Sequence, residues 1–354
     1  MALNFGKKIE VIKQAVATVE VSDESLMESI EQVAAASEAL YEAQADGAVI
    51  CQVLDNLGLA AQAIAKGGLS KQVIGAFNSE GELSAVCGME NLTVEGLEKL
   101  AEADVKALEA KYTAGVEGQM AEYWNKLVAW LKNLWTKLVN WFKNILTNQA
   151  RYVQQLDAVT KSLDASKFNG DASVSLHTAT QINDALTSAG RLIVNLEKAA
   201  NEFKNSGKLA DAKAVEASKK WYSLFGLFEN DTKGLETYQN AEVKEQTIKA
   251  AGFSDVGKIK TLADAYKKVA ASKSFATATK AFTDGLSQLV KEAGSAGALE
   301  GEAAANAKAA VNERRQGVTK MLDAIRKVAG VVQKCGGEIL KAAKASQTKA
   351  AAAK

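Results

Sequence analysis

The chain contains no proline in 354 residues, whereas an average usage near 5% would supply about 18. Proline interrupts helices because it lacks the backbone N–H and its ring clashes with the preceding turn. The same chain contains 64 alanines, the residue with the highest helix propensity. We therefore predict an all-α fold, either a multi-helix bundle or an elongated helical assembly, with no β-sheet.

Glycines and capping residues are the remaining signals for helix ends in a chain without proline. We expect breaks at Gly47, at Gly67-Gly68 and at Cys335-Gly336-Gly337, a loop over residues 79–91 and a flexible stretch over residues 294–301. Helices are expected over residues 9–19, 25–45, 48–66, 70–78, 93–108, 120–163, 176–203, 209–225, 243–251, 256–271, 274–293 and 303–332.

The three cysteines, Cys51, Cys87 and Cys335, are odd in number and far apart in sequence. This pattern predicts reduced, buried thiols and not a disulfide framework. The first residues carry charge before any long apolar run, so we expect no signal peptide. No stretch approaches the roughly 18 apolar residues that a membrane-spanning helix needs.

The net charge of +1 conceals a strong division along the chain. Residues 1–117 carry 19 acidic and 8 basic side chains, for a charge of −11, so the remaining residues carry +12. Such asymmetry indicates different partners for the two segments, or one segment that partners the other. Uneven decoration of solvated helix faces is the alternative interpretation.

Gly115 and Gly118 flank Val116-Glu117 at this charge boundary. Two glycines this close weaken a helix by about 2 kcal/mol relative to alanine, which predicts a hinge or an exposed joint. We therefore divide the chain into three parts. These are an acidic helical region over residues 1–117, a basic helical domain over residues 118–340 and a Lys/Ala-rich tail over residues 341–354.

A tryptophan-rich amphipathic helix follows the joint. Its apolar half includes Trp124, Trp130, Trp135, Trp141 and Phe142, and its opposite half includes Lys126, Lys132, Lys137 and Lys143. Indoles favour the headgroup level of a bilayer and lysines favour anionic lipid, so this helix could lie in a membrane interface. The same pattern describes a bundle helix whose aromatic face fills a core or a subunit interface.

Groups that carry chemistry are sparse. His177 is the single histidine, and its position near a predicted helix start indicates a surface or capping residue. Ser206-Gly207-Lys208 lacks the flanking residues of a phosphate-binding loop. Carboxylates spread over amphipathic helices pair by chance, so they do not indicate a general acid and base. We predict no enzyme activity, no cofactor and no metal site.

The basic residues favour contact with DNA that does not depend on base sequence. The chain has 38 lysines and only five arginines. A surface rich in lysine and poor in arginine suits salt-sensitive contact with phosphates and not readout of bases. Any DNA binding is therefore predicted to be non-specific, and lysines that merely solvate helix faces are the alternative.

Small-x-Glu triplets at Gly115-Val116-Glu117, Gly88-Met89-Glu90 and Ala298-Leu299-Glu300 resemble the sites cut by prohead proteases of giant tailed bacteriophages. The chain as a whole resembles the internal head proteins of such phages, which are helical, rich in Ala, Lys and Glu, and made with an N-terminal propeptide. The resemblance implies that residues 1–117 are the propeptide and that the mature protein begins at Gly118.

These observations favour a structural protein of the phage capsid interior, made as a precursor in the host cytoplasm and cleaved by a prohead protease. Its expected partners are other head proteins and packaged DNA. One alternative is a membrane-active helical protein, pore-forming or lysis-related, that inserts the tryptophan helix. A helical cytoplasmic scaffold without a viral connection is another.

Overall fold

The computed structural model describes residues 23–69, 74, 93, 96, 98–297 and 301–347. Over these residues the predicted all-α fold is confirmed. The α-helices are α2 (Asp23–Gly67), α6 (Glu102–Ser162), α7 (Ala179–Lys204), α8 (Ala214–Ser223), α9 (Glu229–Asn240), α10 (Val256–Ala270), α11 (Lys273–Ala296) and α12 (Gly301–Ala345). Two 3-10 turns, η1 (Ala165–Lys167) and η2 (Leu224–Phe228), complete the helical part. The helix predicted over residues 9–19 lies outside the described residues.

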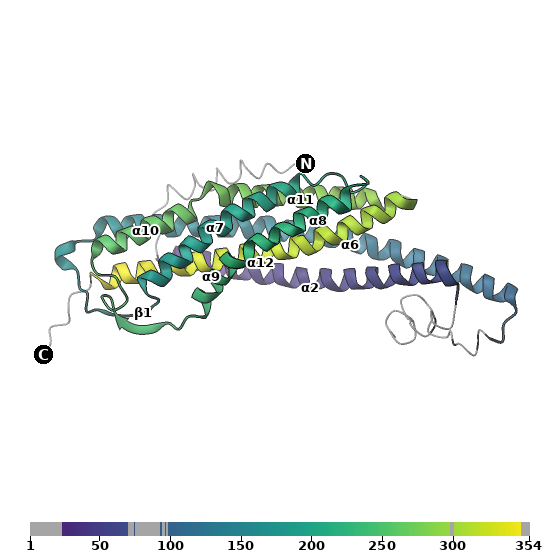
Figure 1. The fold of residues 1–354 in the computed structure, drawn as a ribbon. Coiled ribbons are helices and arrows are strands. Elements are labelled where there is room, and N and C mark those ends of the chain that lie inside the picture. Colours follow the sequence, from purple (N-terminus) through teal and green to yellow (C-terminus); the bar gives the residue numbers. More distant parts are fainter. Residues whose placement is uncertain are drawn as a thin grey trace.

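The molecule is an elongated bundle from which one helical hairpin projects (Figure 1). The long helices α6 and α12 run along the bundle, and α7, α8, α10 and α11 pack against them. The last part of α2, in purple, and the first part of α6, in blue, extend together beyond the ends of the other helices. We call this projecting pair the arm.

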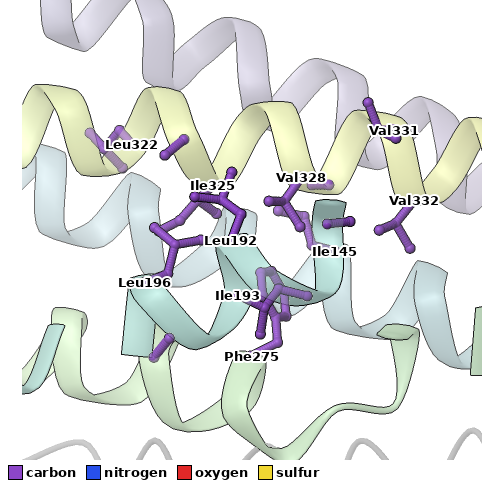
Figure 2. Close-up of a cluster of buried hydrophobic side chains, with 14 of the residues drawn as sticks. Ile145, Leu192, Ile193, Leu196, Phe275, Leu322, Ile325, Val328, Val331 and Val332 are labelled. Atoms are coloured by element: carbon purple, nitrogen blue, oxygen red, sulfur yellow. The ribbon is translucent and has the colours of Figure 1, made fainter. Parts of the chain in front are cut away.

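The main core lies where α6, α7, α11 and α12 meet (Figure 2). Ile145 from α6, Ile193 from α7 and Phe275 from α11 are each no more than 2% exposed. The facing stripe of α12 consists of Leu322, Ile325, Val328, Val331 and Val332. Apolar residues at helical spacing on each element account for this burial, because each helix presents one continuous stripe to its neighbours.

Two short strands correct the prediction of no β-sheet. β1 (Ser173–Leu176) pairs antiparallel with β2 (Lys244–Thr247). The helix predicted over residues 243–251 is therefore wrong. Each strand has only four residues and no residue of β2 is buried, so neither carries enough apolar alternation to be recognised from the sequence.

Several predicted helix breaks are also wrong, because the glycines there serve packing. α2 continues through Gly47, where a side chain would collide with the indole of Trp130. α12 continues through Gly336, where a Cβ atom would lie 2.8 Å from the ring of Tyr266. A glycine that permits close approach of an aromatic ring looks the same in sequence as one that ends a helix.

The ends of two helices also differ from their predicted positions. α12 runs on to Ala345, and Ala342 and Ala343 are fully buried, so the start of the Lys/Ala-rich tail belongs to the bundle. α11 extends to Ala296, into the stretch predicted to be flexible. Residues 298–300 and 348–354 lie outside the described residues.

Gly47→Ala is expected to lower the free energy of unfolding by about 1–3 kcal/mol, because the new methyl group overpacks against Trp130. Gly58→Ala is the matched control on the same helix, where no atom lies within 4 Å of the added carbon. It should stabilise by about 0.5–1 kcal/mol, the usual gain in a helix interior. Urea denaturation of both variants measures the difference, and equal stabilisation by both would contradict the packing role of Gly47.

Candidate cleavage and docking sites on helix α6

The predicted cleavage site lies inside the unbroken helix α6, so the hinge expected at Gly115 and Gly118 is wrong. Gly115, Glu117 and Gly118 are exposed, whereas Val116 is 1% exposed and holds this turn against the end of α2. A protease needs an extended substrate, so cleavage here requires the helix to open locally. The other two small-x-Glu triplets lie outside the described residues.

A small hydrophobic cluster, separate from the main core, stabilises the arm. Its buried members are Leu57, Ala60, Ile64, Leu69, Ile74, Tyr112 and Val116. We call it the arm cluster. All seven residues precede Glu117 in the chain. The boundary predicted from charge therefore falls next to the last buried member of this cluster, and the partly buried Met120 and Tyr123 pack against the cluster from the other side of the boundary.

The tryptophan face of α6 packs inside the protein. Trp124, Trp130, Trp141 and Phe142 are buried, and Trp135 is partly buried. The indole N–H of Trp124 donates to the carbonyl of Ala293 at 2.9 Å, and that of Trp135 donates to Thr283 at 3.2 Å. These hydrogen bonds attach α6 to α11, so this face has the packing arrangement considered from the sequence and is not free to meet a bilayer.

The lysine face of α6 is divided between solvent and α2. Lys126, Lys132 and Lys143 are exposed, and Lys126 also pairs with Glu122 at 2.8 Å. Lys137 is half-buried and donates from Nζ to the carbonyl oxygen of Ala39 at 3.0 Å. Three of the four predicted basic residues are therefore available to an anionic partner, and the fourth is used by α2.

Lys137 belongs to a regular series of side chains that bind α2, which sequence reasoning missed. Four donors on α6 follow one another at intervals of seven residues, and their acceptors on α2 run in the opposite direction. Arg151 donates to the carbonyl of Ser25 at 2.6 Å, Asn144 to Gln32 at 3.2 Å, Lys137 to Ala39 at 3.0 Å and Trp130 to Ala43. We call this series the donor ladder.

The ladder uses backbone carbonyls of α2, each of which has a second lone pair beyond its helical hydrogen bond. α2 carries eight acidic side chains and a single lysine. Among the ion pairs of the described residues, none joins a carboxylate of α2 to the rest of the protein. The ladder therefore fixes the position of α2 along α6. The negative charge of α2 adds only a general attraction to the basic part of the chain after Glu117. The seven-residue spacing of Trp130, Lys137, Asn144 and Arg151 is the sequence signal that could have found it.

α2 is more apolar than predicted, because no stretch was expected to approach the composition of a membrane-spanning helix. Within the described part of the chain, it is the helix that has the length and composition to cross a membrane. Only 22% of its most apolar 18-residue window is buried, and Val49 and Leu59 are exposed. The core helix of a soluble protein can have the same length and composition, so these two properties do not distinguish a membrane span from a packed helix.

His177 is buried, so the prediction of a surface or capping residue is wrong, and its neighbour Thr178 caps α7 instead. Its Nδ1 lies 2.8 Å from Oε1 of Glu338, and its Nε2 lies 3.2 Å from the carbonyl oxygen of Ala241. The hydroxyl of Tyr238 donates to Glu338 at 3.0 Å. This polar cluster connects the end of β1, α9 and α12, and a lone histidine gave no sign of these distant partners.

The described cysteines, Cys51 and Cys335, are buried and free. Burial raises the pKa of the Cys51 thiol to about 11 and that of Cys335 to about 12, which keeps both unreactive near neutral pH. Cys87 lies outside the described residues. In the described part of the chain, no group of three or more His, Cys, Asp or Glu side chains could hold a metal ion.

The described residues thus define an all-α protein organised around packing and docking surfaces. A family model for phiKZ-like phage internal head proteins matches residues 6–258, which is most of the chain and includes both sides of the charge boundary. The chain therefore belongs to this family of internal head proteins, and it has a structural role in the capsid interior of the virion. No curated protein and no solved structure matches it.

Proposed function

We propose that this internal head protein is made as a precursor that a prohead protease cuts after Glu117. The observation that carries the proposal is the coincidence of three boundaries at this residue. The charge changes sign there, Val116 is the last buried member of the arm cluster, and a small-x-Glu triplet presents an exposed glutamate. Residues 1–117 would then form a leader, and the basic remainder would form the mature protein.

The basic remainder supports non-specific contact with packaged DNA. Lys126, Lys132 and Lys143 are exposed along one helix, so they can approach phosphates without rearrangement of the core. The leader carries −11 and would weaken this contact while it is attached. Its removal would raise the affinity for a polyanion.

Cleavage is tested by mass spectrometry of protein from purified virions. We expect the mature chain to begin at Gly118, and Glu117→Gln to abolish this product because the recognised carboxylate is lost. Gly118→Ala should slow cleavage about fivefold, since alanine stabilises the helix by about 1 kcal/mol and reduces local opening. A full set of peptides from residues 1–117, equal in abundance to the rest, would overturn the proposal.

DNA binding is tested by the salt dependence of the affinity for duplex DNA. Replacing Lys126, Lys132 and Lys143 with glutamine should reduce the slope of log affinity against log salt by about 0.9 for each phosphate that these lysines neutralise in the wild-type complex. Lys106→Gln is the matched control, because Lys106 is exposed on the same helix but lies before Glu117 and pairs with Glu102. Equal slopes for the triple variant and the control would contradict DNA binding through this face.

A further inference from the structure

We propose that the α6 surface bearing the donor ladder is a binding site for α2 that does not need the covalent chain. A cut in the chain between α2 and the ladder donors of α6 then leaves a complex of two chains. Dissociation of the leader from this complex is a separate step that follows the cut. The significance of this complex in the phage rests on the cleavage proposed above.

The first argument is the position of the ladder relative to the cut. Its donors lie between residues 130 and 151, and its acceptors lie between residues 25 and 43. Every ladder bond therefore joins the leader to the mature part, and cleavage after Glu117 removes none of them. Asn148 adds a further bond to Ser29 at 2.9 Å within the same interface.

The second argument is the distribution of buried apolar side chains. Leu26, Leu40, Ala43 and Cys51 of α2 belong to the main core together with α6. The buried members of the arm cluster, in contrast, all lie within residues 57–116, although Met120 and Tyr123 pack against them from beyond Glu117. A cut after Glu117 therefore leaves all buried members of the arm cluster in the leader, and the contacts of Met120 and Tyr123 with that cluster join the leader to the mature part. The leader also remains anchored in the main core through α2.

The third argument is that α2 fits α6 much better than it fits α12. Arg326 of α12 donates to the side chain of Gln44 at 2.7 Å, but Arg326 Nε and Gln44 Nε2 are buried without hydrogen-bond partners. Farther along, a groove of about 610 Å³ lies between α2, α6 and α12, lined by Leu54, Trp124 and Ala305 among others. Binding of α2 therefore depends on the α6 side, and the α12 side is where separation should begin.

The experiment cuts the folded full-length protein outside both helices. A recognition sequence for an added, site-specific protease is inserted after Gly81 in one version and after Glu90 in a second version. The experiment needs only one of the two versions to fold. After cutting, we expect both fragments to elute together in size-exclusion chromatography at micromolar concentration. A fluorophore on the α2 fragment then reports its dissociation rate after dilution with an excess of unlabelled fragment.

Lys137→Ala, Asn144→Ala and Arg151→Ala together should accelerate dissociation at least tenfold. Lys126→Ala, Lys132→Ala and Lys143→Ala are the matched control on the same helix, because none of these lysines has a hydrogen bond to α2 in the structure, and the rate should change less than twofold. Separation of the wild-type fragments on the column, or equal rates for the two triple variants, would overturn the inference. Because the protease is added, this result is independent of whether Glu117 is the natural cleavage site.

Discussion

Glu338→Ala is expected to lower the free energy of unfolding by about 3–5 kcal/mol, because it leaves three buried polar groups without a partner at about 1–3 kcal/mol each. The side chain of His177 is fully buried and that of Glu338 is 7% exposed. Glu338 accepts from the backbone N–H of His177 and from Tyr238, and it also contacts the imidazole. Its removal leaves these groups without a partner in a low-dielectric interior.

Two further variants test this explanation, one that removes a single hydrogen bond of the cluster and one that serves as an exposed control on α12. Tyr238→Phe keeps the ring and removes only one buried hydrogen bond, so it should cost about 1–3 kcal/mol. Burial, with Cys335 and Glu338 nearby, raises the pKa of Tyr238 well above its usual range, so its hydroxyl remains a donor. Glu302→Ala, an exposed change at the start of α12, should cost no more than about 1 kcal/mol. Urea denaturation measures all three, and a Glu338→Ala protein as stable as Glu302→Ala would contradict the role of the cluster.

Trp141→Ala is expected to lower the free energy of unfolding by about 3–5 kcal/mol, because it leaves a large cavity in the core. Trp141 is 1% exposed, and its ring stacks on Phe142 at a centroid distance of 5.4 Å. If the aromatic face instead served a membrane, the same truncation would leave stability in solution almost unchanged. Thermal or urea denaturation distinguishes these outcomes.

Trp141→Phe separates the effect of lost side-chain volume from the effect of the unpaired indole N–H group. The indole Nε1 of Trp141 is buried without a hydrogen-bond partner, so its loss removes a desolvated polar group and partly offsets the loss of volume. We expect this variant to cost less than half as much as Trp141→Ala. Trp135→Phe, in contrast, loses the bond to Thr283 and should cost about 1 kcal/mol despite its greater exposure. A loss of stability for Trp141→Phe equal to that for alanine would contradict this account.

The two docking partners of α6 differ in how they are recognised. α11 accepts indole N–H groups at Ala293 and Thr283 beside a continuous apolar core, which makes a permanent interface. α2 is held by a ladder of polar donors beside fewer buried side chains, with an open groove on its other side. An interface of the second kind can be specific and still release its partner, because water can hydrate the half-buried donors Lys137, Asn144 and Arg151 once α2 has left.

The sequence alone determined the helical class, the apolar face of α6 and the position of the charge boundary, because each is a property of composition or of local periodicity. The tertiary structure decided what those features do. Gly47 and Gly336 proved to be packing sites, two four-residue segments about 70 positions apart paired as strands, and His177 gained Glu338 as a partner. Periodicity reports which face of a helix must be covered, but only the three-dimensional arrangement determines which distant segment covers it. For that reason the apolar stripe of α6 was predictable, whereas the ladder that binds α2 was not.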